Sequence, residues 1–266
     1  MEWTDRGIVL SARKHGESSV VVTALTEAHG RHAGLVRGAA RAGGTYEPGN
    51  LVALRWRARL EEHLGNYTAE LVHSFAAPVL DDALRLSALA AACALVDAAL
   101  PEREPHNTVF ESLAALLAAL EQAPALDWQA GFVRFEIDLL RDLGFGLDLS
   151  RCAATGETGG TLAFVSPKTA RAVSKAAGEP YREKLLALPP FLAKEGAAPR
   201  SAAEIAAGLS LTGYFLDRHV FAPHGHVMPP ARARLVDRIE SSDSLAPAPK
   251  DPDNRDPDKE RDKPVP

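Results

Sequence analysis

Cysteine is scarce in this chain. Its 266 residues include two, Cys93 and Cys152, which are too few for the disulfide framework of a small secreted domain. Thr155 occupies the position where a C-x-x-C partner of Cys152 would stand, so we do not expect a structural zinc site with its four ligands. Cys93 lies in an apolar run, where a buried thiol is the usual role. No metal or other cofactor is therefore predicted.

Long hydrophobic runs are also missing. The most apolar stretch, residues 84–100, is interrupted by Arg85, Ser87 and Asp97, whereas a membrane-spanning helix needs about 20 apolar residues. The first residues do not combine a basic segment with an apolar one, so a signal peptide is not expected. These absences predict a cytoplasmic protein.

The common catalytic motifs are absent from the sequence. It contains no G-x-S-x-G, no H-E-x-x-H and no paired Cys/His motif, and residues 156–160 lack the lysine of a phosphate-binding loop. One alternative is a metal-dependent enzyme that uses His219, His224 and His226. Pro223 and Gly225 indicate a helix-end turn there, so we interpret the three histidines as capping and surface residues. We therefore predict that the chain is not an enzyme.

Positive charge is concentrated in one segment, although the chain as a whole is acidic. The net charge is −5, and residues 240–266 alone carry eight Asp and Glu against five Lys and Arg. Residues 30–60 contain six arginines and one acidic residue, Glu47. The six are Arg31, Arg37, Arg41, Arg55, Arg57 and Arg59. This local excess favours a surface that binds an anion.

The last three of these arginines alternate with apolar residues. A strand over residues 51–60 would place Arg55, Arg57 and Arg59 on one face and Trp56 with its apolar neighbours in the core. Like charges so close together repel one another, so we favour a shared phosphate ligand over an ordinary solvated face. Tyr46, in the glycine-rich loop before this strand, is the candidate for stacking on a base.

The first 78 residues have the pattern of a small β barrel. Short strands separated by glycine-rich joints are predicted over residues 7–13, 19–26, 31–37, 51–60 and 66–74. An OB-fold is a five-stranded barrel that binds oligonucleotides, and a five-stranded SH3-like barrel would give the same pattern. The pattern therefore predicts a five-stranded barrel over residues 1–78 and leaves both folds open.

Residues 79–240 are predicted to form a helical domain. Two capping boxes, Thr108–Glu111 and Ser201–Glu204, mark helix starts, and Gly144 marks a left-handed helix end. The stretch at about 146–166 has no helical period and predicts a loop-rich insert. Residues 241–266 form an acidic tail rich in Pro, Asp and Lys, which we expect to be disordered. The predicted fold class is α+β multidomain: a five-stranded barrel followed by an all-α domain with this insert.

An ordered set of short motifs resembles the RecO family of bacterial recombination mediators. The barrel part carries Gly7-Ile-Val-Leu10, Gly16-Glu-Ser18, Leu25-Thr26, Gly30-Arg31 and Val36-Arg-Gly38 with Arg41. The helical part carries Phe135-Glu-Ile-Asp-Leu-Leu-Arg-Asp-Leu-Gly144 and Leu147-Asp148. The resemblance extends in the same order to about residue 240 and leaves the acidic tail outside it.

The resemblance implies a DNA-binding OB-fold over residues 1–78, followed by an all-α domain whose insert is zinc-finger-like but lacks metal ligands in this chain. It also implies binding to single- and double-stranded DNA and annealing of complementary strands. It implies that RecR, and in many bacteria RecF, act with the protein to load RecA onto gaps coated with single-strand-binding protein. It places Arg31, Arg37 and Arg41 among the DNA contacts, whereas Arg55, Arg57 and Arg59 come from the strand pattern alone. Some members hold zinc in the insert through four cysteines, and this chain, which keeps Cys152, resembles the members without the metal.

We therefore expect a non-enzymatic mediator of DNA repair and recombination, cytoplasmic and associated with the nucleoid. By the resemblance, the helical domain would bind the acidic C-terminal tail of single-strand-binding protein. Basic residues that suit this role are Lys168, Arg171, Lys175, Arg182 and Lys184, and a solvated helix face is an equal interpretation of them. The alternative function is an OB-fold adaptor that binds only protein, with its arginines facing an acidic partner.

Overall fold

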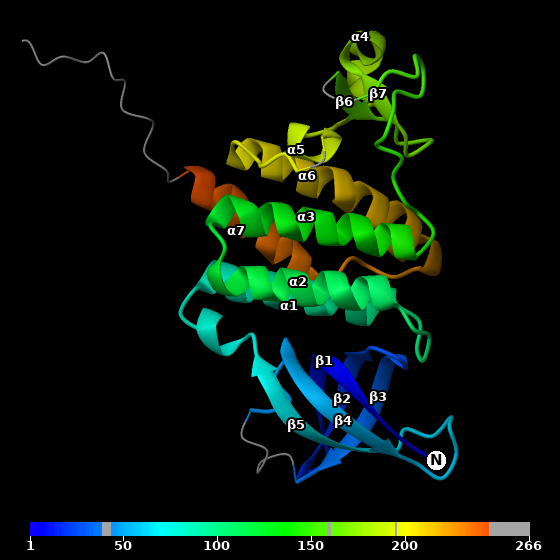
Figure 1. Cartoon of the computed structure of the whole chain (residues 1–266), viewed down its shortest axis with the longest axis vertical. Helices are drawn as coiled ribbons and strands as arrows, with labels where there is room; N and C mark the ends of the chain where they lie inside the picture. Colours follow the sequence, from blue (N-terminus) through cyan, green and yellow to red (C-terminus); the bar gives the residue numbers. More distant parts are fainter. Residues whose placement is uncertain (39–43, 159–160, 195, 245–266) are drawn as a thin grey trace, which may run out of the picture.

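The computed structural model of the chain describes residues 1–38, 44–158, 161–194 and 196–244, and arranges them as a β barrel, a helical layer and a small insert (Figure 1). The barrel lies at one end of the molecule and the insert at the other, with the helices between them. The strands of the barrel are β1 (Glu2–His15), β2 (Ser19–Thr26), β3 (Gly30–Arg37), β4 (Asn50–Arg57) and β5 (Asn66–Ser74).

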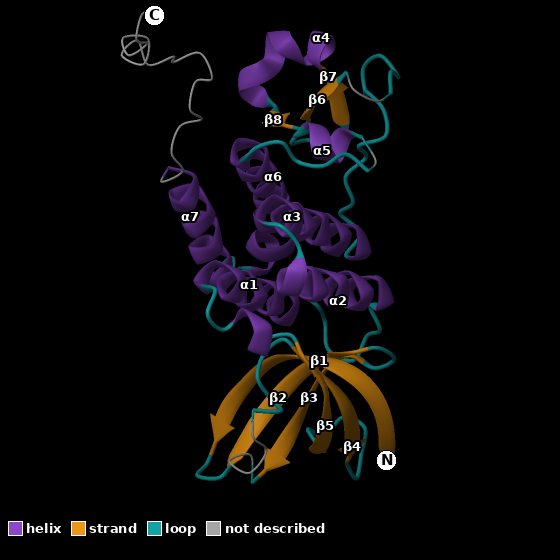
Figure 2. Ribbon diagram, turned by 60° about the vertical axis from the view of Figure 1, so that its left-hand side comes forward, coloured by secondary structure: helices purple, strands orange, loops and turns teal. Residues whose placement is uncertain are grey.

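These strands close into a barrel in the order β1-β2-β3-β5-β4 (Figure 2). Neighbours are antiparallel except for β3 and β5, which pair in parallel at Leu35 and Asn66. Strand β1 pairs with β4 through its first half and with β2 through its second half, and its register shifts between Val9 and Ser11. A bulge of this kind bends a strand around a barrel. The architecture is the predicted OB-like, five-stranded barrel.

The alternation predicted for β4 is confirmed inside the strand. Val52, Leu54 and Trp56 point into the barrel, each 2% exposed or less, and Arg55 and Arg57 lie on the outside. The expected end of the strand is wrong, because β4 stops at Arg57. The neighbouring strands β1 and β5 both start at this level: Arg57 pairs with Glu2, the first residue of β1, and with Asn66, the first residue of β5.

Apolar residues of the barrel form two separate groups. One fills the barrel and comprises Val9, Val22, Ala24, Val36, Val52, Leu54, Trp56 and Tyr67. The other, Ile8, Leu10 and Leu25, belongs to the core of the helical domain. Part of the outer surface of the barrel is therefore covered by helices and is not available to a ligand.

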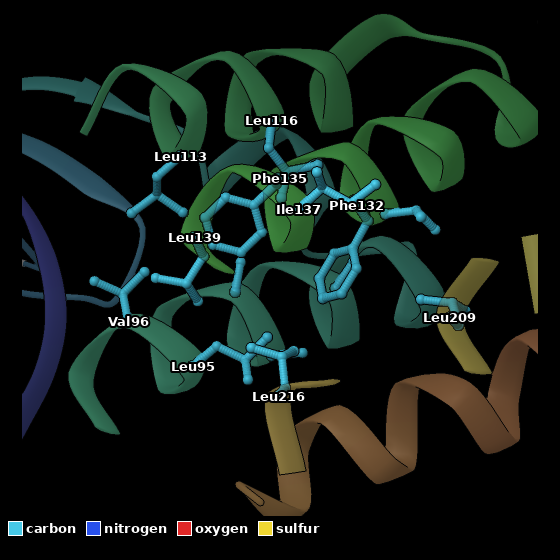
Figure 3. Packing of buried hydrophobic residues seen from close by; sticks show 14 of the residues in the cluster. Leu95, Val96, Leu113, Leu116, Phe132, Phe135, Ile137, Leu139, Leu209 and Leu216 are labelled. Atoms are coloured by element: carbon cyan, nitrogen blue, oxygen red, sulfur yellow. The ribbon is translucent and has the colours of Figure 1, made fainter. Parts of the chain in front are cut away.

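The helical domain is built from α1 (Ala83–Ala99), α2 (Asn107–Gln122), α3 (Ala125–Asp142), α6 (Ala202–Phe215) and α7 (Pro230–Ser244), with η2 (Ala77–Val79) before them. A π-helical turn, η4 (Leu216–Phe221), and the short η5 (Ala222–His224) follow α6. Figure 3 shows the shared core: Leu95 and Val96 of α1, Leu113 and Leu116 of α2, Phe132, Phe135, Ile137 and Leu139 of α3, Leu209 of α6 and Leu216 of η4. Within the described residues, no helix combines the length and apolarity that a membrane span requires.

Three helix ends test the expected capping signals. Ser201 accepts a hydrogen bond from the backbone N–H of Glu204 at 3.3 Å, as its capping box predicts. Gly144, after α3, has a φ of 87°, the left-handed conformation that we expected. The box at Thr108 is wrong, because α2 begins at Asn107 with His106 as its cap residue. His106 contacts Asp142 at the end of α3, so a tertiary contact and not a local cap sets this start.

A buried ion pair joins three helices of this domain. Arg232 of α7 donates to the carboxylate of Glu136 in α3 at 2.6 and 3.0 Å. Arg232 also donates to the carbonyl of Leu209 in α6 at 2.7 Å. The carboxylate is fully buried and Arg232 is 7% exposed, so each charge depends on the other for its solvation.

The insert contains more regular structure than its sequence indicated. Its sheet has the order β7-β6-β8, and β6 falls inside the stretch predicted to be loop-rich. Because β6 has four residues, it is too short to give a recognisable alternation. The elements of this region are β6 (Leu162–Val165), β7 (Ala172–Ser174), α4 (Lys175–Gly178), η3 (Glu179–Lys184), β8 (Leu186–Ala187) and α5 (Pro190–Ala193). Residues 241–244 of the expected tail continue α7, and the rest of that tail lies outside the described residues.

Candidate nucleic-acid interface

Two of the predicted arginines stand side by side on the outer face of β4. The side chains of Arg55 and Arg57 are 60% and 78% exposed. Register places Thr4 and Thr68 beside Arg55 on the neighbouring strands. Both arginines share one carboxylate, that of Glu2: Arg55 is in close contact with it, and Nε of Arg57 lies 3.9 Å from it. Exposed pairs of this kind contribute about 0–1 kcal/mol, so a phosphate can displace Glu2.

The surface around this pair is hollowed. A shallow groove of about 660 Å³ runs over β1, β4 and β5, and its lining includes Arg6, Arg55, Thr68 and Glu70. Arg6 is already paired with Glu27 through two hydrogen bonds of 3.0 Å. Both arginines that line the groove, Arg6 and Arg55, are therefore paired with a carboxylate. Arg57 of β4, at 3.9 Å from Glu2, is held less closely.

Arg59 does not belong to the strand face. It lies in a bend two residues beyond the end of β4 and is exposed. The strict alternation that we expected for the three arginines therefore holds for Arg55 and Arg57 and not for Arg59. Arg59 extends the positive charge into the loop between β4 and β5.

Arg37 is exposed at the end of β3, on the outer side of the barrel. Ser19 pairs with both Arg37 and His15, so β1, β2 and β3 bring these residues into one row. Arg13 lies on the same face of β1, with a side chain 79% exposed. Sequence reasoning missed this part of the site, although the run Arg13-Lys14-His15 immediately before Gly16 is a visible signal. Arg41 lies outside the described residues.

Arg31 faces the helical domain and not solvent. Its Nε donates to the carbonyl of Leu100 at 2.8 Å, and its side chain is 18% exposed. Its guanidinium also lies 3.4 Å from Asp97 and 3.6 Å from Glu102. Next to it, a Cβ on Gly30 would lie 1.8 Å from the carbonyl oxygen of Glu104. The resemblance assigns Arg31 to DNA, and that assignment stays a prediction; in the structure this end of β3 packs against the α1–α2 loop.

Tyr46 is half-buried against the apolar residues that fill the barrel. Burial raises the pKa of its hydroxyl, against the effect of a hydrogen bond from the Ala69 backbone. Packing and this bond hold Tyr46 against the barrel, so part of its ring is covered and cannot stack on a base.

A stack of aromatic rings lies at the mouth of the barrel. Trp3 of β1 is stacked on Trp56 of β4 with ring centres 5.6 Å apart, and on His29 of the β2–β3 turn at 4.1 Å. His32 lies beneath them and shares a hydrogen bond of 2.8 Å with the Tyr67 hydroxyl. Burial lowers the pKa of His32 to about 4, and the nearby Arg103 adds to this effect. The prediction that Trp56 is a core residue is confirmed by its 1% exposure.

The basic residues proposed for the helical domain all lie on the insert or at its edge. Lys168, Lys175, Arg182 and Lys184 are exposed. Arg171 lies 3.4 Å from Asp148, and Arg182 lies 3.8 Å from Glu179. Of these five, Lys175 lines an apolar groove on the insert, together with Ala163 and Ala176.

A groove of that kind exists elsewhere in the same domain. It has a volume of about 660 Å³ and runs between α3, the start of the insert and α5. Ile137, Leu147 and Phe191 contribute apolar surface, and Arg141 and Lys194 lie at its sides. Arg134 lines it too, with its guanidinium 5.5 Å from the centre of the Phe191 ring. The sequence placed Ile137 in a helix, but it gave no sign that residues 147–150 and 191–196 would form a groove along that helix.

Cys152 is buried in the insert and is part of a small hydrogen-bonded cluster. The backbone N–H of Ser174 donates to its sulfur at 3.2 Å. Burial raises the pKa of the thiol, but hydrogen bonds from Ser174 and Thr155 outweigh it and lower the pKa to about 6. Among the described residues, no three His, Cys, Asp or Glu side chains converge as metal ligands.

Comparisons with known proteins cover almost the whole chain. Residues 1–75 match the family model described as recombination protein O N terminal, and residues 80–227 match recombination protein O C terminal. The DNA repair protein RecO of Rhodospirillum centenum is 54% identical over 255 residues, which cover 94% of this chain and 100% of that protein. The RecO proteins of Rhodospirillum rubrum and Phenylobacterium zucineum are 50% and 49% identical and cover 90% and 92% of this chain, and 96% and 100% of their own lengths. With two family models that match most of its length and relatives at about this identity, the chain belongs to the RecO family of DNA repair proteins.

Proposed function

We propose that this protein is a recombination mediator that binds single- and double-stranded DNA on the outer face of its barrel and anneals complementary strands. The observation that carries the proposal is the exposed pair Arg55 and Arg57, which a single carboxylate opposes. Arg37, Arg59 and the basic end of β1 extend the charge around the barrel.

The mechanism is electrostatic. Each arginine that neutralises a phosphate releases condensed counterions from the DNA, which is the main source of affinity at low salt. Neutralising two strands on one surface also reduces their mutual repulsion, and this favours annealing. The protein needs no catalytic group for this role, and we expect it to act in the cytoplasm on nucleoid DNA.

A salt series of fluorescence anisotropy with a single-stranded oligonucleotide tests this role. Replacing Arg55, Arg57 and Arg59 by alanine should flatten the slope of log K against log salt by about 2, since each lost phosphate contact changes it by about 0.7. The matched control replaces Arg218, Arg234 and Arg238, which are exposed on η4 and α7, and should leave the slope unchanged. Absence of binding at low salt would favour the alternative, an adaptor that binds only protein.

The helical domain supplies a place for a protein partner. An acidic peptide that ends in apolar residues, such as the C-terminal tail of single-strand-binding protein, fits the groove between α3 and α5. Its apolar end would contact Leu147 and Leu192, and its carboxylates would meet Arg141 and Lys194. By family resemblance, RecR and in many bacteria RecF would act with the protein to load RecA.

Binding of a labelled tail peptide separates this groove from the basic residues of the insert. Arg141→Ala should weaken binding of the peptide, because the side chain is 61% exposed at the groove. Its ion pair with Asp138, at 2.7 Å on the same helix, is of a kind that contributes about 0.3–0.5 kcal/mol, so a peptide carboxylate can compete for it. Lys184→Ala removes one exposed positive charge from the insert in the same way, and it should leave the affinity for the peptide unchanged. A loss of affinity confined to Lys184→Ala would move the peptide site to the insert.

A further inference from the structure

The aromatic stack at the mouth of the barrel forms a ladder that rises from the core to the surface. Trp56, the lowest ring, is 1% exposed. Trp3 lies over it at an interplanar angle of 21°, and His29 lies over Trp3 at 8°. The side chain of His29 is 35% exposed. Because Trp3 covers one face of the imidazole, the exposed part of His29 lies on its other side.

The orientation of His29 is fixed by its surroundings. Its Nδ1 lies 2.9 Å from the carboxylate of Asp5, which also accepts the backbone N–H of Ala28 at 2.8 Å. Its own backbone N–H donates to the Thr26 hydroxyl at 3.1 Å. The ring is therefore held flat on Trp3 before any ligand arrives, and little side-chain entropy remains to be lost on binding.

A pocket lies beside the ladder, since all three of its rings, Trp56, Trp3 and His29, line it. This pocket has a volume of about 500 Å³ and is lined by Glu2, Trp3, His29, His32 and Arg103, among others. A volume of this size is typical of small-molecule sites. Arg103 comes from the α1–α2 loop, and its Nη2 donates to the carbonyls of Glu62 and His63 at 3.1 and 3.2 Å. The helical domain thus completes a site whose floor belongs to the barrel.

The pocket adjoins the proposed phosphate-binding face. Glu2 lines the pocket and is also the carboxylate shared by Arg55 and Arg57. A strand whose phosphates displace Glu2 from the two arginines would therefore pass the mouth of the barrel. A base from that strand could reach the ladder only if it were unpaired.

We propose that His29 stacks on one unpaired DNA base as the next rung above Trp3. The proposal rests on DNA binding by the barrel and adds to it a preference for single strands, since a base inside a duplex has no free face. Stacking on an aromatic side chain is tolerant of sequence, so the site would accept any base.

A single-stranded oligonucleotide that contains 2-aminopurine, whose fluorescence falls when it stacks, tests the proposal. With the full-length protein we expect quenching on binding. His29→Gln should remove the quenching and weaken single-strand affinity by about 5- to 150-fold, without a comparable effect on a duplex. His29→Phe keeps an aromatic face and should retain most of both signals. His224→Gln, at an exposed histidine of the helical domain, is the matched control.

The outcomes are distinct. If the wild-type protein does not bind the oligonucleotide at low salt, the proposed DNA-binding function fails. If it binds, and His29→Gln binds and quenches as the wild type does, the base site is wrong while DNA binding stands. An equal loss for His29→Gln and His29→Phe would also overturn stacking, because it would assign the effect to the contact with Asp5.

Discussion

Substitution of Arg31 by alanine should lower stability without changing the salt dependence of DNA binding. Arg31 and Arg37 lie on the same strand, six residues apart, and the family resemblance gives both to DNA. In the structure Arg31 bonds to Leu100 and lies near Asp97, whereas Arg37 is exposed at the strand end. The two substitutions remove the same charge from two different environments.

The magnitude for Arg31 follows from its contacts. A hydrogen bond from a charged donor contributes about 1.5–3 kcal/mol, and the carbonyl of Leu100 would lose one. Glu102 is 57% exposed and adds little, and Asp97 keeps a second partner, since Arg13 lies 3.5 Å from it. We expect a loss of about 2 kcal/mol, which for a protein of this size lowers the thermal midpoint by about 4–8 °C.

Two assays on the same variants check this. Thermal unfolding should show the loss for Arg31→Ala and almost none for Arg37→Ala. The salt slope of single-strand binding should flatten by up to about 0.7 for Arg37→Ala and stay unchanged for Arg31→Ala. A flattened slope with an unchanged thermal midpoint for Arg31→Ala would refute the assignment of Arg31 to the domain contact.

Three further predictions concern stability. Arg232→Met should cost about 3–5 kcal/mol in denaturant unfolding, because it leaves the carboxylate of Glu136 buried and unpaired, and adding Glu136→Leu should restore much of that loss. Stability should fall as the pH drops from 6.5 towards 4, since the pKa of His32 is about 4 in the folded protein and ordinarily 6.5. In this range the unfolded chain binds a proton that the folded chain does not. Unfolding curves of His32→Phe, measured over the same pH range, should lack this part of the loss of stability. Gly30→Ala should lower the thermal midpoint much more than Gly16→Ala: both glycines have positive φ, of 65° and 70°, but a Cβ has space at Gly16 alone.

The sequence by itself determined the local patterns. Alternation separated Trp56 from Arg55 and Arg57, because a strand sends successive side chains to opposite faces. The apolar run around Cys93 predicted a buried thiol, and Cys93 is 1% exposed in α1. The ordered motifs indicated the RecO family, which the comparisons then established. Alternation, an apolar run and each single motif are patterns of a few neighbouring residues, and only the order of the motifs extends along the chain.

Only the tertiary structure decided which outward-facing residues are free. Alternation places Arg31 and Arg37 on the same outer side of β3, but a helical domain covers one end of that strand and not the other. The ladder of Trp56, Trp3 and His29 joins residues from β4, β1 and the β2–β3 turn, and the register that brings them together is a property of the closed barrel. Periodicity therefore separates the inside of an element from its outside, while the coverage of the outside depends on contacts between segments far apart in the sequence.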